Sequence, residues 1–149
     1  MTNSGTPKLA GDSVVASRLV TQEAINAYAV ASGDHNPLHT DPAFAATTPL
    51  GGAVAHGMLV LAWLSALLTA AYGQDWPAHG SLRIRFRAPA RPGDLLELRA
   101  TVRAVAASPV GSTATLDLFV ANQRGDVVID GQAAVTTSSP PSTANASSW

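Results

Sequence analysis

Hydrophobic and polar positions alternate with different periods along the chain, and these periods divide it into elements. A β-prone run at Ser13–Val20 predicts the first strand. Thr21 then offers an N-cap oxygen, and apolar residues follow at helical spacing as far as Ala31, which predicts a short helix. Asp41 and Pro42 predict the start of another helix, because aspartate caps helices and proline is favoured at the first helical position.

The longest apolar segment, Gly57 to Tyr72, predicts a central helix. Its apolar residues cover every face at 3.6 residues per turn, so we expect this helix to be buried on all sides. The segment is too short to cross a bilayer comfortably. In a chain of 149 residues, the simplest way to bury such a helix is to wrap a sheet around it.

Four further strands in an antiparallel meander are predicted after this helix. In the first, Leu82–Arg87, apolar residues alternate with arginines, which predicts one dry face and one basic, solvated face. The others are Leu95–Val105, Thr113–Ala121 and Val127–Thr137, with a hairpin turn at 122–126. We therefore predict an α+β fold in a single domain of residues 1–137. Residues 138–149 are rich in Ser and Pro and are expected to be a disordered tail.

Composition narrows the classes of function. Charged residues make up only 13% of the chain and hydrophobic residues 46%, so we expect another subunit to cover part of the surface. A net charge of -1 argues against non-specific binding to nucleic acid or to an anionic membrane. The absence of cysteine excludes disulfides, thiolate catalysis and thiolate metal sites. The first residues lack the pattern of a signal peptide, so a cytoplasmic location is expected.

Candidate chemistry concentrates in the stretch Ser32–Asp41, where a glycine and a proline argue against a helix. Asp34 and His39 supply an acid and an imidazole on this stiff turn, and Asn36 between them can orient a neighbour. Proton transfer to a polarised carbonyl compound needs such an acid/base pair together with an electrostatic sink.

The sink is expected at Gly57, because the first N–H groups of a helix lack partners and glycine lets a ligand oxygen approach closely. His56 could contact a ligand, or pack inside the chain or between subunits. Ser65, about two turns further along the same side of the helix, could touch the acid/base pair or only fill space. No metal site is expected, because the proline between His35 and His39 breaks the helix that would align them.

Two blocks of the sequence have a familiar spacing. They are Tyr28-Ala29-x-x-Ser32-Gly33-Asp34-x-Asn36-Pro37-Leu38-His39-x-Asp41-Pro42 and Ala55-His56-Gly57-Met58. They resemble the hydratase-2 motif of MaoC-like (R)-specific enoyl-CoA hydratases and dehydratases, and beyond Met58 only the strand pattern agrees. This resemblance implies the hot-dog fold, an antiparallel sheet around a central helix. It also implies a homodimer, or a heterodimer with a second hot-dog chain.

The resemblance further implies roles for single residues. Asp34 and His39 correspond to the catalytic pair of the family. Gly57 corresponds to the N–H donor to the thioester oxygen, and Asn36 to a residue that shapes the loop. Ser65 falls near the pair. The implied reaction is reversible hydration of a trans-2-enoyl thioester, carried on CoA or an acyl carrier protein, to the (R)-3-hydroxyacyl thioester, without a cofactor. Two alternatives stay open: an acyl thioesterase of the same fold, and a non-catalytic partner subunit of a heteromeric dehydratase.

Overall fold

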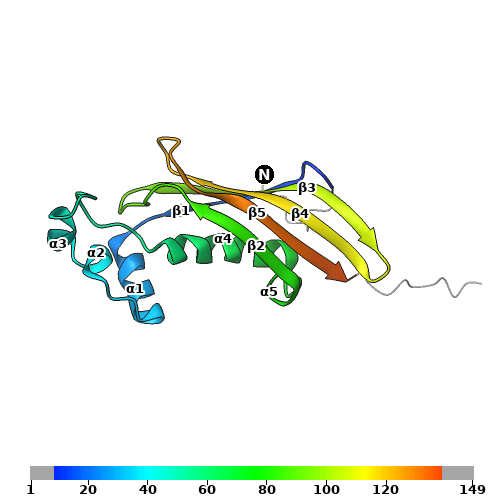
Figure 1. Ribbon diagram of the computed structural model, residues 1–149, viewed down its shortest axis with the longest axis horizontal. Coiled ribbons are helices and arrows are strands. Elements are labelled where there is room, and N and C mark those ends of the chain that lie inside the picture. The colour runs from blue at the N-terminus through cyan, green and yellow to red at the C-terminus, as the bar shows by residue number, and fades with distance from the viewer. Residues whose placement is uncertain (1–8, 139–149) are drawn as a thin grey trace, which may run out of the picture.

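The structure is a computed structural model that describes residues 9–138. Five antiparallel strands form one sheet, and a long helix, α4, lies along one of its faces (Figure 1). β5 extends to Ser138, one residue beyond the predicted domain, and the rest of the predicted tail lies outside the described residues. The elements are β1 Ser13–Leu19, α1 Gln22–Ser32, α2 Pro37–Thr40, α3 Pro42–Ala46, α4 Gly57–Tyr72, α5 Asp75–His79, β2 Gly80–Phe86, β3 Leu95–Ser108, β4 Gly111–Ala121 and β5 Val127–Ser138.

The strand order in the sheet is β1-β3-β4-β5-β2. The predicted meander is therefore confirmed for β3, β4 and β5 but wrong for β2, which pairs with β5 and not with β3. Residues 87–94 carry the chain from β2 at one edge to β3, which lies next to β1 at the other. The edge strands of the sheet are therefore β1, which precedes the helices in the chain, and β2, which follows them.

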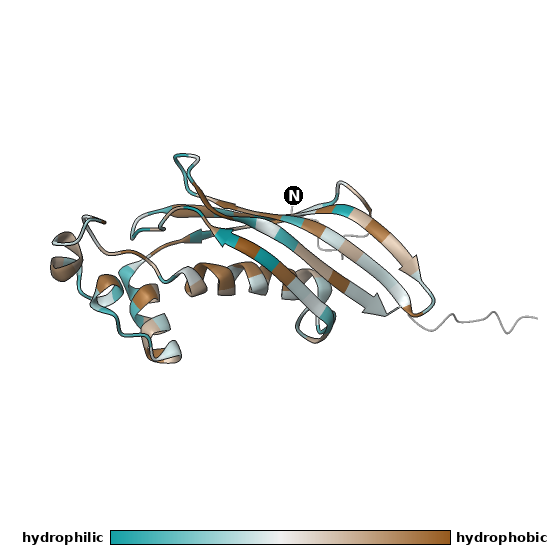
Figure 2. Cartoon of the chain, in the orientation of Figure 1, coloured by the Kyte–Doolittle hydropathy of each residue, from teal (hydrophilic) through white to brown (hydrophobic). Residues whose placement is uncertain are grey.

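The core forms between α4 and the concave face of the sheet. Leu64 and Leu68 of α4 are fully enclosed, and burying each such side chain contributes about 1.5–3 kcal/mol. Alternate residues of the three middle strands meet them, which produces the banded hydropathy of these strands in Figure 2. None of the helices within residues 9–138 combines the length and the hydropathy required to span a bilayer. The enclosed strand residues include Leu96, Leu98, Val102, Leu116, Leu118, Val120, Ile129 and Val135.

The expectation that α4 is buried on all sides is wrong within this single chain. Its buried residues face the sheet, but a stripe at four-residue spacing on the other side is exposed: Met58, Ala62, Ala66 and Ala70. The apolar side of β2 is also not dry, since Leu82 is 37% and Phe86 52% exposed. One five-stranded sheet covers only one side of the helix (Figure 1). We refer to the exposed α4 stripe together with Leu82 and Phe86 as the open face.

The short helices follow local capping rules. Thr21 Oγ1 accepts a hydrogen bond from the N–H of Ala24 and starts α1 as predicted. α2 was not expected, because a proline usually argues against a helix, but Pro37 occupies its first position, where the missing N–H costs nothing. α5 was also missed, and its Pro77 lies in the first turn for the same reason.

Candidate active site

The loop after α1 is shaped by short-range hydrogen bonds. Gly33 ends the helix with a φ of 77°, a left-handed conformation that glycine adopts without strain. The Asp34 N–H donates to Ser32 Oγ over 3.2 Å, and Asp34 Oδ1 accepts from the N–H of Asn36, also over 3.2 Å. Asn36 Oδ1 in turn accepts from the N–H of Leu38 and caps α2. Asn36 thus shapes the loop that carries Asp34.

His39 is fixed by main-chain contacts at the end of α2. Its Nδ1 lies 2.7 Å from the carbonyl oxygen of Val54, which can only accept, so Nδ1 carries the proton. In the neutral ring, Nε2 therefore keeps a free lone pair. Gln22 of α1 donates from its side-chain amide to the His39 carbonyl over 2.8 Å. The imidazole is consequently held in one tautomer, with its basic nitrogen free.

Asp34, His39 and His56 converge in space. One carboxylate oxygen of Asp34 and one ring nitrogen from each histidine all lie within 4.8 Å of one another. Hydrogen bonds to water span about 2.7–3.0 Å, so two such groups can bind one water molecule between them. Asp34 is exposed, His39 half-buried and His56 buried, so solvent can approach from the aspartate side. Two imidazoles and a carboxylate could also ligate a metal ion, and the expectation of no metal stays a prediction.

His56 forms the floor of this cluster. Its ring stacks on that of His39 with centroids 3.9 Å apart and an interplanar angle of 28°, and it meets the Tyr28 ring at 4.9 Å. The side chain is only 3% exposed, and its Nε2 lies 3.0 Å from the Asp34 carbonyl oxygen. Its Nδ1 is enclosed without a hydrogen-bond partner among the described residues.

Gly57 directly follows His56 and begins α4 next to a pocket of about 490 Å³. No residue between 9 and 138 accepts a hydrogen bond from its N–H, because Gly57 is the first residue of α4 and has no helical carbonyl one turn before it. A Cβ at Gly57 would lie 2.8 Å from Cε1 of Phe86, so a larger residue here would displace the Phe86 ring. The pocket is lined by Ala55, Gly57, Met58, Val60, Phe86, Arg87, Ala88, Pro89, Ala90 and Val128, and thus not by Asp34 or His39.

Ser65 lies apart from these residues. It is eight positions after Gly57, which corresponds to about 12 Å along the helix axis. Its Oγ accepts a hydrogen bond from the indole N–H of Trp76 over 2.8 Å, which ties α4 to α5. Within this chain, Ser65 therefore joins α5 to the middle of α4.

A profile of the MaoC like domain matches residues 7–116 of the sequence. The chain belongs to the MaoC-like family. It is 38% identical over 115 residues to the (R)-specific enoyl-CoA hydratase of Aeromonas caviae, covering 74% of this chain and 81% of that protein. It is 32% identical over 117 residues to the 3-hydroxybutyryl-CoA dehydratase of Methylorubrum extorquens, covering 78% and 72%.

Solved structures agree with this membership. The R-hydratase PhaJ1 from Pseudomonas aeruginosa superposes with a TM-score of 0.77 at 28% identity, covering 89% of this MaoC-like chain and 84% of that one. The (R)-hydratase from A. caviae gives a TM-score of 0.74 at 31% identity, covering 87% and 96%. The hot-dog fold expected from the sequence is thereby confirmed.

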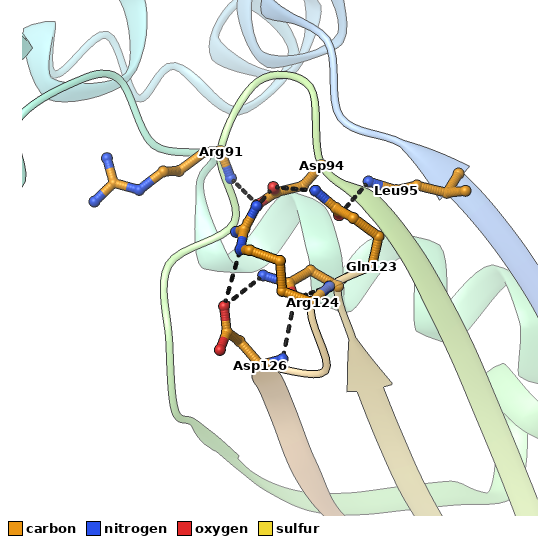
Figure 3. A network of polar contacts seen from close by, with 7 residues as sticks. Arg91, Asp94, Leu95, Gln123, Arg124 and Asp126 are labelled. Carbon is orange, nitrogen blue, oxygen red and sulfur yellow. Dashed lines mark hydrogen bonds and ion pairs between the residues drawn. The ribbon is translucent and has the colours of Figure 1, made fainter.

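One structural feature near the pocket of this MaoC-like domain was missed from the sequence. Asp94 is 3% exposed and accepts from the Arg91 N–H over 2.9 Å and from the Gln123 amide over 3.2 Å (Figure 3). It also pairs with Arg124 at 3.1 Å. This network joins residues 88–94 to the hairpin between β4 and β5. Because the Ala90 carbonyl accepts from the Ala55 N–H over 2.8 Å, the network also supports one wall of the pocket.

Charge and hydrogen bonding within the hairpin shift two pKa values. Hydrogen bonds from Asn122 and then from Arg124 lower the pKa of Asp126 below its usual range. The hydrogen bond to Asp126, followed by the charge of Asp94, raises the pKa of Arg124. Both side chains are exposed, so these shifts describe how the hairpin is arranged and say little about its stability.

Proposed function

We propose that this MaoC-like domain catalyses the reversible hydration of a trans-2-enoyl thioester to a 3-hydroxyacyl thioester. The observation that carries the proposal is the convergence of Asp34, His39 and His56 within 4.8 Å. Relatives that are 32–38% identical are named enoyl-CoA hydratase and 3-hydroxybutyryl-CoA dehydratase, which supports the same reaction in its two directions. The (R) configuration at C3 rests on the names of the relatives and on the sequence motif.

Asp34 and His39 hold one water molecule in the proposed mechanism. The pair removes a proton from this water as its oxygen bonds to C3 of the enoyl group, and the electrons of the C2–C3 double bond move toward the thioester carbonyl. The pair then returns a proton to C2, so no proton is gained or lost overall. The Nδ1–H bond of His39 to Val54 supports this step, because it leaves Nε2 free to accept a proton.

Gly57 supplies the electrostatic sink. Negative charge develops on the thioester oxygen as water adds, and the free Gly57 N–H at the start of a 16-residue helix can meet it. Loss of one such donor typically costs about 2.7–4 kcal/mol of transition-state stabilisation. The adjacent pocket of about 490 Å³ is large enough for a short acyl chain, and apolar side chains such as Val60 and Phe86 line it.

The substrate is an acyl thioester, and the names of relatives include two carriers. One relative is named a 3-hydroxybutyryl-CoA dehydratase and another a 3-hydroxyacyl-[acyl-carrier-protein] dehydratase. Both carriers present the same thioester to the site, so assays with each carrier distinguish them. The cytoplasmic location expected from the sequence stays a prediction.

We also propose that two copies of the chain associate through the open face. An exposed apolar stripe on the central helix, next to the half-exposed Phe86 on an edge strand, is the kind of surface that a second subunit covers. The low charged fraction of 13% agrees with such an interface. A homodimer is the expected assembly, and a second chain of the same fold is the alternative.

The purified protein alone, incubated with crotonyl-CoA, tests the reaction. Hydration predicts that the absorbance of the conjugated enoyl thioester falls to an equilibrium value and that the thioester remains intact. Release of free thiol would instead indicate the thioesterase alternative. An inactive monomer that becomes active only with a second hot-dog chain would indicate the partner-subunit alternative.

A further inference from the structure

We propose that His56 is a positioning residue of the acid/base pair, which acts by donating its Nε2–H to the Asp34 main chain and not by touching the substrate. This inference rests on the proposed function and assigns a role within the same site. Of the alternatives left open by the sequence, contact with a ligand or packing inside the chain or between subunits, the burial of His56 favours packing inside the chain.

The tautomer of His56 follows from its partner. The Asp34 carbonyl oxygen, 3.0 Å from Nε2, can only accept, so the ring proton lies on Nε2. Nδ1 of the neutral ring is then an acceptor, enclosed without a partner among the described residues. A phenylalanine would fill this space without a buried unpaired nitrogen. What the histidine adds is the N–H directed at Asp34.

This bond is the long-range anchor of Asp34. Among residues 9–138, the other hydrogen-bond partners of Asp34 are Ser32 and Asn36, two residues away on either side. The contact with His56 spans 22 positions and ties the exposed loop to the start of α4. Without it, the position of the Asp34 carboxylate would depend on the loop alone.

The same short segment also anchors His39. The Val54 carbonyl holds His39 Nδ1 at 2.7 Å, and the His56 ring stacks on the His39 ring at 3.9 Å. Residues 54–56 therefore hold both members of the pair. The Val54 carbonyl accepts from the His39 ring, and the His56 ring donates to the Asp34 main chain and stacks on the His39 ring. Because His56 is only 3% exposed and its Nδ1 is enclosed, a substrate cannot reach its free nitrogen. Its influence on the reaction must pass through Asp34 and His39.

Two substitutions separate the hydrogen bond from the ring contact. His56→Phe keeps a ring against His39 but loses the donor, whereas His56→Gln keeps an amide N–H near the Nε2 position but loses the ring. A small misplacement of catalytic groups can cost about 100-fold, so we expect His56→Phe to lower kcat roughly 10- to 100-fold with little change in KM. His56→Gln is expected to recover most of this loss, and His79→Gln on the distant α5 should keep the wild-type kcat.

Wild-type kcat for His56→Phe, a raised KM at unchanged kcat, or a His56→Gln enzyme as slow as His56→Phe would overturn the proposal. Nitrogen NMR of the wild-type protein with labelled histidine adds a test that needs neither a variant nor activity. The expected spectrum shows His56 protonated on Nε2 and His39 on Nδ1. A proton on Nδ1 of His56 would contradict the assignment even if the protein hydrates enoyl thioesters, and the expected tautomers in an inactive protein would refute the hydratase function alone.

Discussion

At the scale of single residues, the acid/base pair is held by main-chain carbonyls and not by a bond between its members. Val54 fixes the ring of His39, and the Asp34 carbonyl receives the N–H of His56. These two contacts involve neither Nε2 of His39 nor the Asp34 carboxylate, of which Oδ1 accepts from the Asn36 N–H. Both groups can therefore serve a water molecule, as the proposed addition to C3 requires.

Catalysis should be sensitive even to a single methyl group added at Gly57. In Gly57→Ala, the new Cβ would lie 2.8 Å from Phe86 and would narrow the approach to the N–H of this pocket-lining residue. Because Phe86 is 52% exposed, its ring can move aside, so the melting temperature should change little. We expect kcat/KM for crotonyl-CoA to fall roughly 10- to 100-fold.

The double variant Gly57→Ala/Phe86→Ala is the control for this substitution. It removes the Phe86 ring that the new methyl group would contact. If Gly57→Ala loses activity only through this clash, the double variant should recover that activity. If Gly57→Ala itself retains wild-type kcat/KM, the assignment of its N–H as the donor to the thioester oxygen loses its support.

The motif paired Asp34 with His39 on one short turn, and the structure brings these two side chains together with His56. Their roles in the reaction stay a prediction. The anchors could not be predicted in the same way, because the Val54 carbonyl and the enclosed Asp94 are defined by contacts between segments distant in the sequence. Ser65, which helical period and the motif resemblance placed near the pair, instead accepts a hydrogen bond from Trp76 of α5, a helix that the sequence pattern did not predict.

At the scale of elements, α4 was predicted with its observed bounds, Gly57–Tyr72, because sixteen residues of apolar sequence leave few other choices. The pairing of β2 was not predicted. Alternation along a strand identifies its two faces but not its neighbours, and β2 pairs with the last strand of the chain. The burial of α4 was overestimated, because the spacing of apolar residues along the sequence does not show whether one chain or two cover the helix.

The open face gives a test of the proposed dimer. Ala66→Glu would place a carboxylate in the middle of the exposed α4 stripe, where a partner chain would have to bury it without a counter-charge. We expect light scattering to show the mass of a dimer for the wild type and of a monomer for this variant. Circular dichroism should show that the helix content is unchanged, since glutamate is a good helix former.

Val30→Glu is the matched control for charge on an exposed helical position, because Val30 of α1 is 76% exposed and lies outside the open face. It should remain dimeric. A wild-type protein that is monomeric at micromolar concentration, or an Ala66→Glu variant with unchanged mass, would show that the open face is not the dimer interface.

At the scale of the whole molecule, the Asp94 network connects the pocket wall to the hairpin at 122–126 (Figure 3). Asp94→Ala would leave the part-buried Arg91 N–H without its acceptor and remove the ion pair with Arg124. We expect the free energy of unfolding to fall by about 1–3 kcal/mol in urea denaturation. Asp117→Ala removes an exposed ion pair with Arg103 and should cost less than about 1 kcal/mol. Equal effects of the two variants would mean that Asp94 does not brace the fold.

In the proposed reaction, Asp34 and His39 together add water to an enoyl thioester. The most direct measurement compares the rate of crotonyl-CoA hydration by the wild type with that by Asp34→Asn and by His39→Gln, each verified to be folded. Both substitutions keep the size of the side chain but remove its ability to transfer a proton. We expect kcat to fall roughly 10²- to 10⁴-fold in each variant. Full activity in either variant would contradict the role of this pair.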